Sequence, residues 1–223
     1  MNVSRLAERY HAVRSAIPPS VKLIAVSKKR TVQEIQALYD LGHRAFGENY
    51  PQELRDKQPQ LPTDIEWHFI GHLQSNKIKY LGAFTRLVHG VDSVKLLDAL
   101  ADRAKGEGRI QDVLLQVHIA QEETKHGFSQ DEIRALWATD PAEHWPDLRI
   151  CGLMGMATNI EFQAQVEKEF NGLHTFFLEL RSKGPGRSYF QELSMGMSGD
   201  VEQAVKAGST MVRIGTAIFG ERG

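Results

Sequence analysis

The chain has 223 residues, and its 27 Lys and Arg against 28 Asp and Glu give a formal net charge of -1. This balance lacks the basic excess of a nucleic-acid-binding protein, and the near-average composition excludes a collagen-like or disordered chain. The N-terminus is charged where a signal peptide would be apolar, and no apolar run approaches the roughly 18 residues of a membrane span. We therefore expect one globular domain over residues 1–223, a cytoplasmic monomer.

Short apolar runs rich in β-branched residues alternate with longer segments of helical periodicity. The short runs predict strands at residues 22–28, 44–47, 66–71, 86–91, 112–119, 148–154, 189–195 and 210–215. The longer segments predict helices at residues 3–16, 31–41, 50–58, 75–82, 93–106, 129–139, 161–183 and 199–208. Thr31 with Glu34 and Ser129 with Glu132 fit the capping box at two helix starts, and Ser93 is the expected N-cap of a third.

Strands that alternate with helices predict a parallel sheet, and eight such strands close into a (β/α)8 barrel, the TIM barrel, here with an extra N-terminal helix. An open doubly wound sheet is the alternative. The G-x-G-x-x-G motif of dinucleotide-binding sheets does not follow the first predicted strand, which favours the barrel. The single cysteine, Cys151, lies in an apolar run and is expected in the core.

Lys28 ends the first apolar run, and ligand groups of a barrel lie at the carboxyl ends of its strands. Because side chains alternate along a strand, Lys28 shares a face with Ile24 and Val26, whereas Lys29 faces elsewhere. A partly desolvated lysine has a lowered pKa, and its amine can form a Schiff base with an aldehyde. The alternative is that Lys28 extends into solvent as an ordinary surface cation.

Hydroxyl groups and glycines follow the last two predicted strands. Ser194 and Ser198 lie in a glycine-containing turn after the seventh strand, and Gly215 and Thr216 follow the eighth. Barrels commonly bind phosphate at this place, where hydroxyls and backbone N–H groups complement the anion. The alternative is that these residues only build turns.

Arg213 lies within an apolar run, where a buried guanidinium needs a ligand acceptor or a salt bridge; Glu48 and Glu192 are the candidate carboxylates. His68 and His72 have the i, i+4 spacing of some zinc sites, but they fall on a strand and its loop rather than on a helix. No cysteine pair or acidic partner accompanies them, and we expect no metal site.

Several short motifs are spread along nearly the whole chain. Together with Asp200, they resemble those of the pyridoxal phosphate homeostasis proteins (the YggS/PROSC group), and they occur in the same order as in that family. The motifs are residues 25–28 (AVSK), 46–50 (FGENY), 67–71 (WHFIG), 73–77 (LQSNK), 193–198 (LSMGMS), 212–215 (VRIG) and 218–220 (IFG).

This resemblance implies a barrel like the N-terminal domain of alanine racemase. It implies that Lys28 holds pyridoxal 5'-phosphate as a Schiff base and that Arg213 faces the pyridine nitrogen. Asn49 would lie at the edge of the cofactor. The phosphate contacts would come from Ser194, Ser198, Gly215 and Thr216.

The family implies a non-catalytic carrier that buffers the cofactor and supplies it to apo forms of dependent enzymes. The second acid/base of alanine racemase is a tyrosine from a separate C-terminal domain, which we do not expect here because the chain ends soon after the eighth strand. Two alternatives stay open: a small amino acid racemase that acts through Lys28 alone or with Tyr50, and a phosphate-binding barrel without Schiff-base chemistry.

Overall fold

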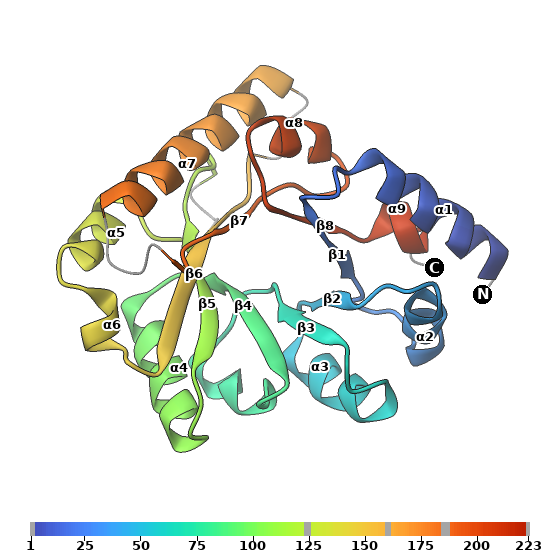
Figure 1. The fold of residues 1–223 in the computed structure, drawn as a ribbon, viewed down its shortest axis with the longest axis horizontal. Helices are drawn as coiled ribbons and strands as arrows, with labels where there is room; N and C mark the ends of the chain where they lie inside the picture. Colours follow the sequence, from blue (N-terminus) through green and yellow to red (C-terminus); the bar gives the residue numbers. More distant parts are fainter. Residues whose placement is uncertain (1–2, 123–125, 159–161, 184–187, 222–223) are drawn as a thin grey trace.

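Eight parallel strands form a closed barrel in the computed structural model, which describes residues 3–122, 126–158, 162–183 and 188–221 (Figure 1). Each strand pairs with the next in sequence, and β8 pairs with β1. The predicted (β/α)8 barrel is thus confirmed, and the open sheet is excluded. The strands are β1 (Lys22–Val26), β2 (Ala45–Glu48), β3 (Glu66–Phe69), β4 (Thr85–Val91), β5 (Gln111–Val117), β6 (Leu148–Gly155), β7 (Glu192–Ser194) and β8 (Met211–Ile214).

Helices surround the barrel, and within the described residues none is long and apolar enough to cross a membrane. The α-helices are α1 (Val3–Ala16), α2 (Val32–Asp40), α3 (Pro51–Lys57), α4 (Val94–Gly106), α5 (Gln130–Trp137), α6 (Pro141–His144), α7 (Gln163–Lys183), α8 (Val201–Lys206) and α9 (Thr216–Phe219). The 3-10 helices are η1 (Gln58–Gln60) and η2 (Ser75–Tyr80).

The predicted element boundaries needed several corrections. The α-helix expected at 75–82 is the 3-10 helix η2, and the short helices α6 and α9 were not predicted, because four residues carry too little periodicity. The strand expected at 189–195 shrinks to β7. The first residue of the helix predicted at 161–183 lies outside the described residues.

Local capping explains where two helices begin. The capping boxes of Thr31 with Glu34 and of Ser129 with Glu132 are both formed, as predicted. Ser93 occupies the N-cap position of α4, but its side chain makes no capping hydrogen bond there.

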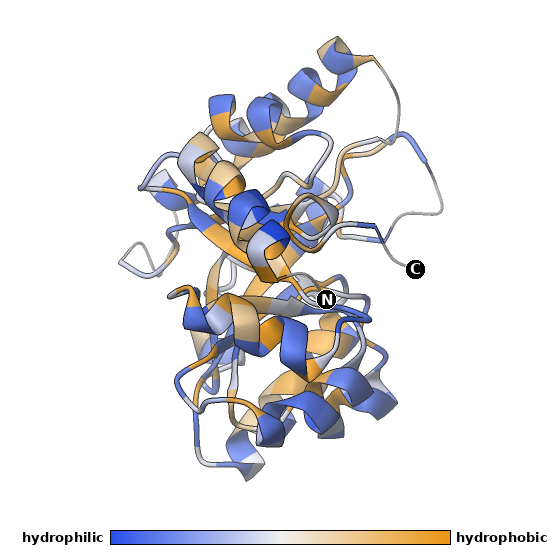
Figure 2. Ribbon diagram, turned by 90° about the vertical axis from the view of Figure 1, so that its right-hand side faces the viewer, coloured by the Kyte–Doolittle hydropathy of each residue, from blue (hydrophilic) through white to orange (hydrophobic). Residues whose placement is uncertain are grey.

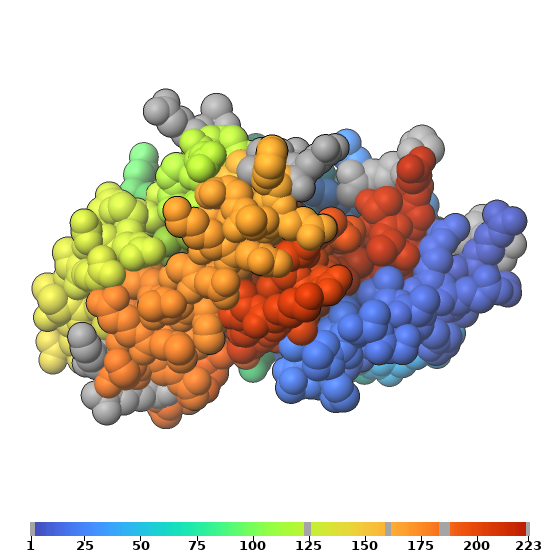
Figure 3. Space-filling model, turned by 90° about the horizontal axis from the view of Figure 1, so that it is seen from above, coloured from blue at the N-terminus to red at the C-terminus, as the bar shows by residue number. Residues whose placement is uncertain are grey.

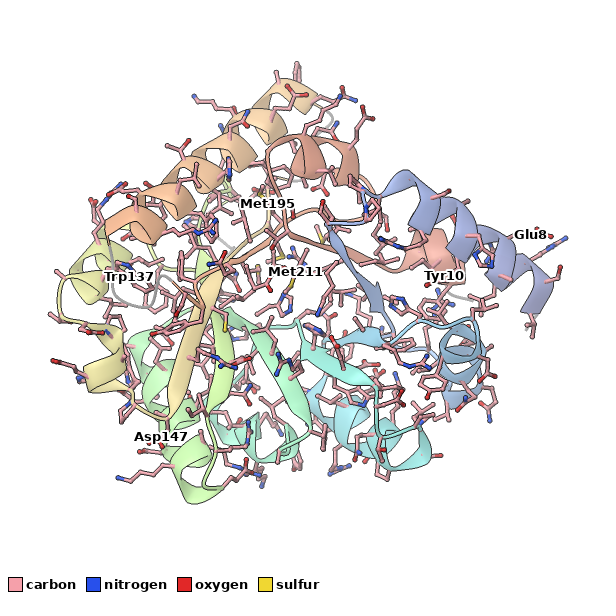
Figure 4. The ribbon with its side chains drawn as sticks, viewed as in Figure 1. Glu8, Tyr10, Trp137, Asp147, Met195 and Met211 are labelled. Atoms are coloured by element: carbon pink, nitrogen blue, oxygen red, sulfur yellow. The ribbon has the colours of Figure 1, made fainter. Side chains whose placement is uncertain are left out.

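The N-terminal helix α1 completes the outer layer where the helix after β8 is short. Because α9 has only four residues, α1 packs beside it and against α2 (Figure 3). Tyr10 lies on α1 (Figure 4). Its hydroxyl oxygen is 3.4 Å from Nδ1 of the buried His43. The other ring nitrogen of His43 lies 2.8 Å from the carbonyl oxygen of Ala45, so this contact joins α1 to the start of β2.

Two apolar clusters lie on opposite sides of the strands. The larger cluster fills the space between barrel and helices, whose outward faces are hydrophilic (Figure 2). The smaller cluster lies inside the barrel and includes Met154, Met211 and Cys151, which confirms the cysteine as a core residue. Burial raises the pKa of the Cys151 thiol to about 12, so the sulfur stays protonated and unreactive.

Candidate functional site

A cavity of about 320 Å³ opens at the carboxyl ends of the strands and unites most of the predicted site residues. Its lining comes chiefly from the loops after β1, β2, β7 and β8. Ser194 is the one predicted residue outside this lining. The lining residues are Val26, Lys28, Asn49, Ile70, Met156, Met197, Ser198, Gly199, Arg213, Gly215 and Thr216.

The chain turns sharply just after Lys28. Lys29 has a left-handed backbone with φ of 58° and is exposed, whereas Lys28 is half-buried and lines the cavity. This turn ends β1 at Val26, two residues earlier than predicted. The structure therefore places Lys28, and not Lys29, where an amine can meet a ligand in the cavity.

Lys57, a residue that the sequence analysis did not single out, anchors the residue before Lys28. Its ammonium group donates to the carbonyl oxygen of Ser27 at 2.9 Å and to Oε1 of Glu48 at 2.8 Å. The Ser27 hydroxyl donates to the same carboxylate oxygen at 2.7 Å. Burial raises the pKa of Glu48, against the lowering effects of Lys57 and Ser27, so this carboxylate depends on the ammonium for its charge.

Glu53 anchors the residue that follows Lys28. Its Oε2 accepts from the backbone N–H of Lys29 and from the Lys57 ammonium, both at 2.7 Å. The buried Lys57 ammonium thus fixes both neighbours of Lys28. It holds Ser27 directly through the carbonyl oxygen, and it holds Lys29 indirectly through the Glu53 carboxylate. This arrangement fixes the backbone from which Lys28 reaches the cavity.

We predict that Lys57→Met destabilises the fold by about 3–5 kcal/mol, because Glu48 loses its buried partner. Since burial raises the pKa of Glu48, the folded variant binds a proton there more readily than the unfolded chain does, and stability falls as pH rises. Urea unfolding should therefore show a larger loss of unfolding free energy, relative to the wild type, at about pH 8 than at about pH 5.

The matched control is Lys206→Met, which breaks an exposed i, i+4 ion pair with Glu202 and should leave stability unchanged. A Lys57 variant no less stable than this control at either pH would contradict the role given to the buried ammonium.

Arg213 lies in the floor of the cavity and is buried, with 4% of its surface exposed. Burial lowers the pKa of its guanidinium to about 10, which still leaves a cation at neutral pH. The guanidinium donates to the Ser194 hydroxyl oxygen at 2.5 Å and to the Gly155 carbonyl at 3.2 Å. Both acceptors are neutral, and the negative charge of Asp200 partly opposes the lowering of the Arg213 pKa by burial.

The two carboxylates considered as salt-bridge partners of Arg213 make other contacts. Glu48 pairs with Lys57, and Glu192 accepts a hydrogen bond from the Thr210 hydroxyl at 2.9 Å. Neither of these carboxylates therefore pairs with Arg213, which lines the cavity where a ligand acceptor would bind.

Ser194 was expected at a phosphate, but it lies fully buried behind Arg213. Its oxygen is also 2.9 Å from Nδ1 of His89, and Nε2 of His89 is 3.0 Å from Nδ1 of His68. A chain of hydrogen bonds therefore runs from the cavity floor through the middle of the barrel. Ser194 therefore supports Arg213 from inside the barrel.

One order of donors, starting from Arg213, satisfies the chain. Arginine only donates, so the Ser194 oxygen accepts from Arg213; in this order the hydroxyl hydrogen then points to Nδ1 of His89. His89 then donates through Nε2 to His68, whose own Nε2 lies 3.9 Å from a carboxylate oxygen of Glu66. Burial lowers the pKa of both histidines, which favours the neutral rings that this order requires.

We predict that Ser194→Ala and His89→Ala are coupled, because each variant leaves the other residue's buried polar atom without its partner. A double-mutant cycle from urea unfolding should give an interaction energy of about 1 kcal/mol or more. As a control, Ser15→Ala on the exposed face of α1 should add to His89→Ala within about 0.5 kcal/mol. If the stability changes of both pairs of variants are additive, the hydrogen-bond chain through Ser194 and His89 is contradicted.

Backbone geometry shapes the opposite wall of the cavity. A Cβ atom on Gly215 would lie 3.2 Å from Cβ of Val26, so glycine permits the close approach of β8 and β1. Helix α9 begins directly after it at Thr216, and the first N–H groups of a helix have no partner within the helix. Gly196, with φ of 96°, makes the turn after β7 that carries Ser198 to the same cavity.

Asn49 lines the cavity from the loop after β2, and its Oδ1 is buried without a hydrogen-bond partner among the described residues. A buried amide oxygen without a donor costs free energy. A ligand group that carries an N–H or O–H would satisfy this oxygen.

Comparison with known proteins agrees with this geometry. The family model of the alanine racemase N-terminal domain matches residues 1–223. The pyridoxal phosphate homeostasis proteins of Pasteurella multocida (strain Pm70) and Escherichia coli (strain K12) are 39% and 40% identical to the chain over 219 and 210 residues. These matches cover 95% and 92% of this chain, and 92% and 87% of those relatives. The chain belongs to the pyridoxal phosphate homeostasis protein family. The family predicted from the motifs is thus confirmed.

Solved structures show the same relationship. PipY of Synechococcus elongatus PCC7942 without PLP has a TM-score of 0.90 at 38% identity, covering 96% of this chain and 100% of PipY. The PipY structure with PLP bound has a TM-score of 0.86 at 37% identity over the same shares. Alanine racemase from Bartonella henselae has a TM-score of 0.74 at 14% identity, covering 100% of this chain and 61% of the racemase, which shows the shared fold alone.

Proposed function

We propose that this chain binds pyridoxal 5'-phosphate in the cavity at the barrel mouth and acts in its homeostasis as a carrier and buffer, without turnover. The observation that carries the proposal is the gathering of three groups around one cavity. A half-buried lysine, a buried guanidinium and a loop of exposed amides and hydroxyls suit an aldehyde, a ring nitrogen and a phosphate. PipY, which shares the fold at 37% identity, has been solved with PLP bound.

Lys28 is the group proposed to hold the cofactor. When bound, pyridoxal 5'-phosphate supplies an aldehyde that condenses with amines and a ring that withdraws electrons. The anchored backbone on both sides of Lys28 limits where its amine can go, so the covalent link would form in one place. The buried Oδ1 of Asn49 would accept a hydrogen bond from the bound group.

The proposed phosphate subsite comprises Gly215, Thr216 and Ser198. All three residues line the cavity, and α9 begins at Thr216, where the first backbone N–H groups have no partner within the helix. Such groups donate hydrogen bonds to an anion and require no fixed counter-charge. Ser194 is not included, since it is fully buried and its hydroxyl lies between Arg213 and His89.

Arg213 supports storage rather than catalysis. A guanidinium can only donate, so a ring nitrogen opposite it keeps its lone pair unprotonated and withdraws electrons weakly. Tyr50, the second acid/base that the racemase alternative would use, is 44% exposed and is not part of the cavity lining described here. We propose that a cytoplasmic monomer releases the cofactor to apo-enzymes, with no role for nucleic acid or membrane.

We predict that pyridoxal 5'-phosphate gives a visible Schiff-base absorption band with the wild-type chain and with Lys29→Ala, but not with Lys28→Ala. After borohydride reduction, peptide mass spectrometry should find the pyridoxyl group on Lys28. Lys29→Ala is the matched control, because it removes the adjacent exposed amine from the same turn. A band that persists in Lys28→Ala would contradict the assignment of the lysine. No band in the wild type would contradict the proposed covalent attachment and leave the alternative of a phosphate-binding barrel.

A further inference from the structure

Three metal-ligating side chains that the cofactor cavity does not use converge at the mouth of the barrel. His72 follows β3, Asp92 follows β4 and His126 follows β5, so three consecutive strands deliver them. Their ligand atoms all lie within 4.8 Å of one another. Nδ1 of His72 is 3.0 Å from Oδ2 of Asp92, and the rings of His72 and His126 stack with centroids 4.3 Å apart at an angle of 21°.

Close backbone packing fixes the loop that carries His72. A Cβ atom on Gly71 would lie 2.3 Å from the carbonyl oxygen of Asn49, and one on Gly90 would lie 2.6 Å from the carbonyl oxygen of Gly71. Neither position can hold a larger residue without moving the backbone. Gly71 therefore packs the end of β3 against the loop after β2, and Gly90 packs β4 against the end of β3. His72 follows Gly71 directly, and Asp92 lies two residues after Gly90.

His126 is held from the neighbouring strand. Its carbonyl oxygen accepts from the Gln116 amide at 2.7 Å, and the N–H of Phe128 donates to the Gln116 carbonyl at 2.8 Å. Between them, Gly127 has φ of 145°, and a Cβ atom there would lie 2.5 Å from the backbone nitrogen of His118. The segment thus adds to the edge of β5, and it presents His126 toward the other two side chains.

The chemistry of the three groups suits a divalent transition metal. Two imidazoles and one carboxylate are a common ligand set for zinc and its neighbours in open sites, where water fills the remaining positions. In a tetrahedral site with bonds of roughly 2.1 Å, two ligand atoms lie about 3.4 Å apart, so atoms at the 4.8 Å limit must approach by up to about 1.4 Å. Because an imidazole binds a metal in the plane of its ring, one of the two stacked rings must also turn toward the ion. His72, whose side chain is 48% exposed, has room to do so, whereas Asp92, at 11%, is the fixed member.

We propose that His72, Asp92 and His126 form a site for one divalent transition-metal ion, with Zn²⁺ as the ion that the ligands suit best. The sequence analysis considered His72 only with His68, four residues before it. His68 points into the barrel interior instead, and the true neighbours come from the next two strands. The site is independent of the proposed cofactor function, because none of its three residues lines that cavity.

The test is titration of the chelator-treated, tag-free full chain with Zn²⁺ by calorimetry and with Co²⁺ by visible absorption, without pyridoxal 5'-phosphate. We expect one equivalent to bind to the wild type and to raise its melting temperature. His72→Ala, Asp92→Asn and His126→Ala should each weaken binding about tenfold or more. Affinity should fall as the solution is acidified, because protons compete for the imidazole nitrogens.

The control variants are His11→Ala and His144→Ala, which remove exposed histidines outside the cluster and should leave the affinity unchanged. Circular dichroism checks that each variant is folded. Stoichiometric binding that survives loss of the cluster histidines, or that the control variants weaken equally, would overturn the proposal. So would the absence of any Zn²⁺ binding to the folded wild type.

Discussion

Arg213 carries a positive charge into the interior of the barrel, and its N–H groups need acceptors there because bulk water does not reach them. Strand β7 supplies Ser194, β6 supplies a carbonyl, and β4 supplies His89 behind the serine. These strands meet only when the barrel is closed. The same contacts that offset the burial of the guanidinium therefore link its position to the closure of the fold, and His68 continues the chain toward the opposite end.

The first strand depends on a second buried cation in the same way. Lys57 joins α3 to the end of β1 through a carbonyl and two carboxylates, and so determines where Lys28 leaves the strand. Two buried cations thus support the site: Arg213 lies in the cavity floor, and Lys57 lies beside the cavity. We propose that this rigidity serves binding, while an arginine opposite the ring nitrogen limits how far the cofactor is activated.

The sequence predicted the barrel well, because alternating strands and helices and two capping boxes are local patterns. It also indicated Lys28 rather than Lys29, although β1 ends at Val26 and a left-handed turn at Lys29, not strand alternation, separates the two side chains. It did not reveal Lys57, which four residues after Glu53 looks like half of an ordinary surface ion pair. The contact of Ser194 with His89 was not predicted for a related reason: it spans 105 residues of sequence, and no local pattern encodes a pairing across the barrel. Such contacts follow from closure and register.

The central claim is that the chain holds pyridoxal 5'-phosphate on Lys28 and does not use it on amino acids. The most direct measurement is exchange of the Cα hydrogen of L-alanine or L-serine in deuterated water, followed by mass spectrometry, for cofactor-loaded wild type, Lys28→Ala and free cofactor. The account predicts that the wild type exchanges no faster than the free cofactor. Lys28-dependent exchange at about 1 per second or more, with loss of stereochemistry, would contradict it and identify an amino acid racemase.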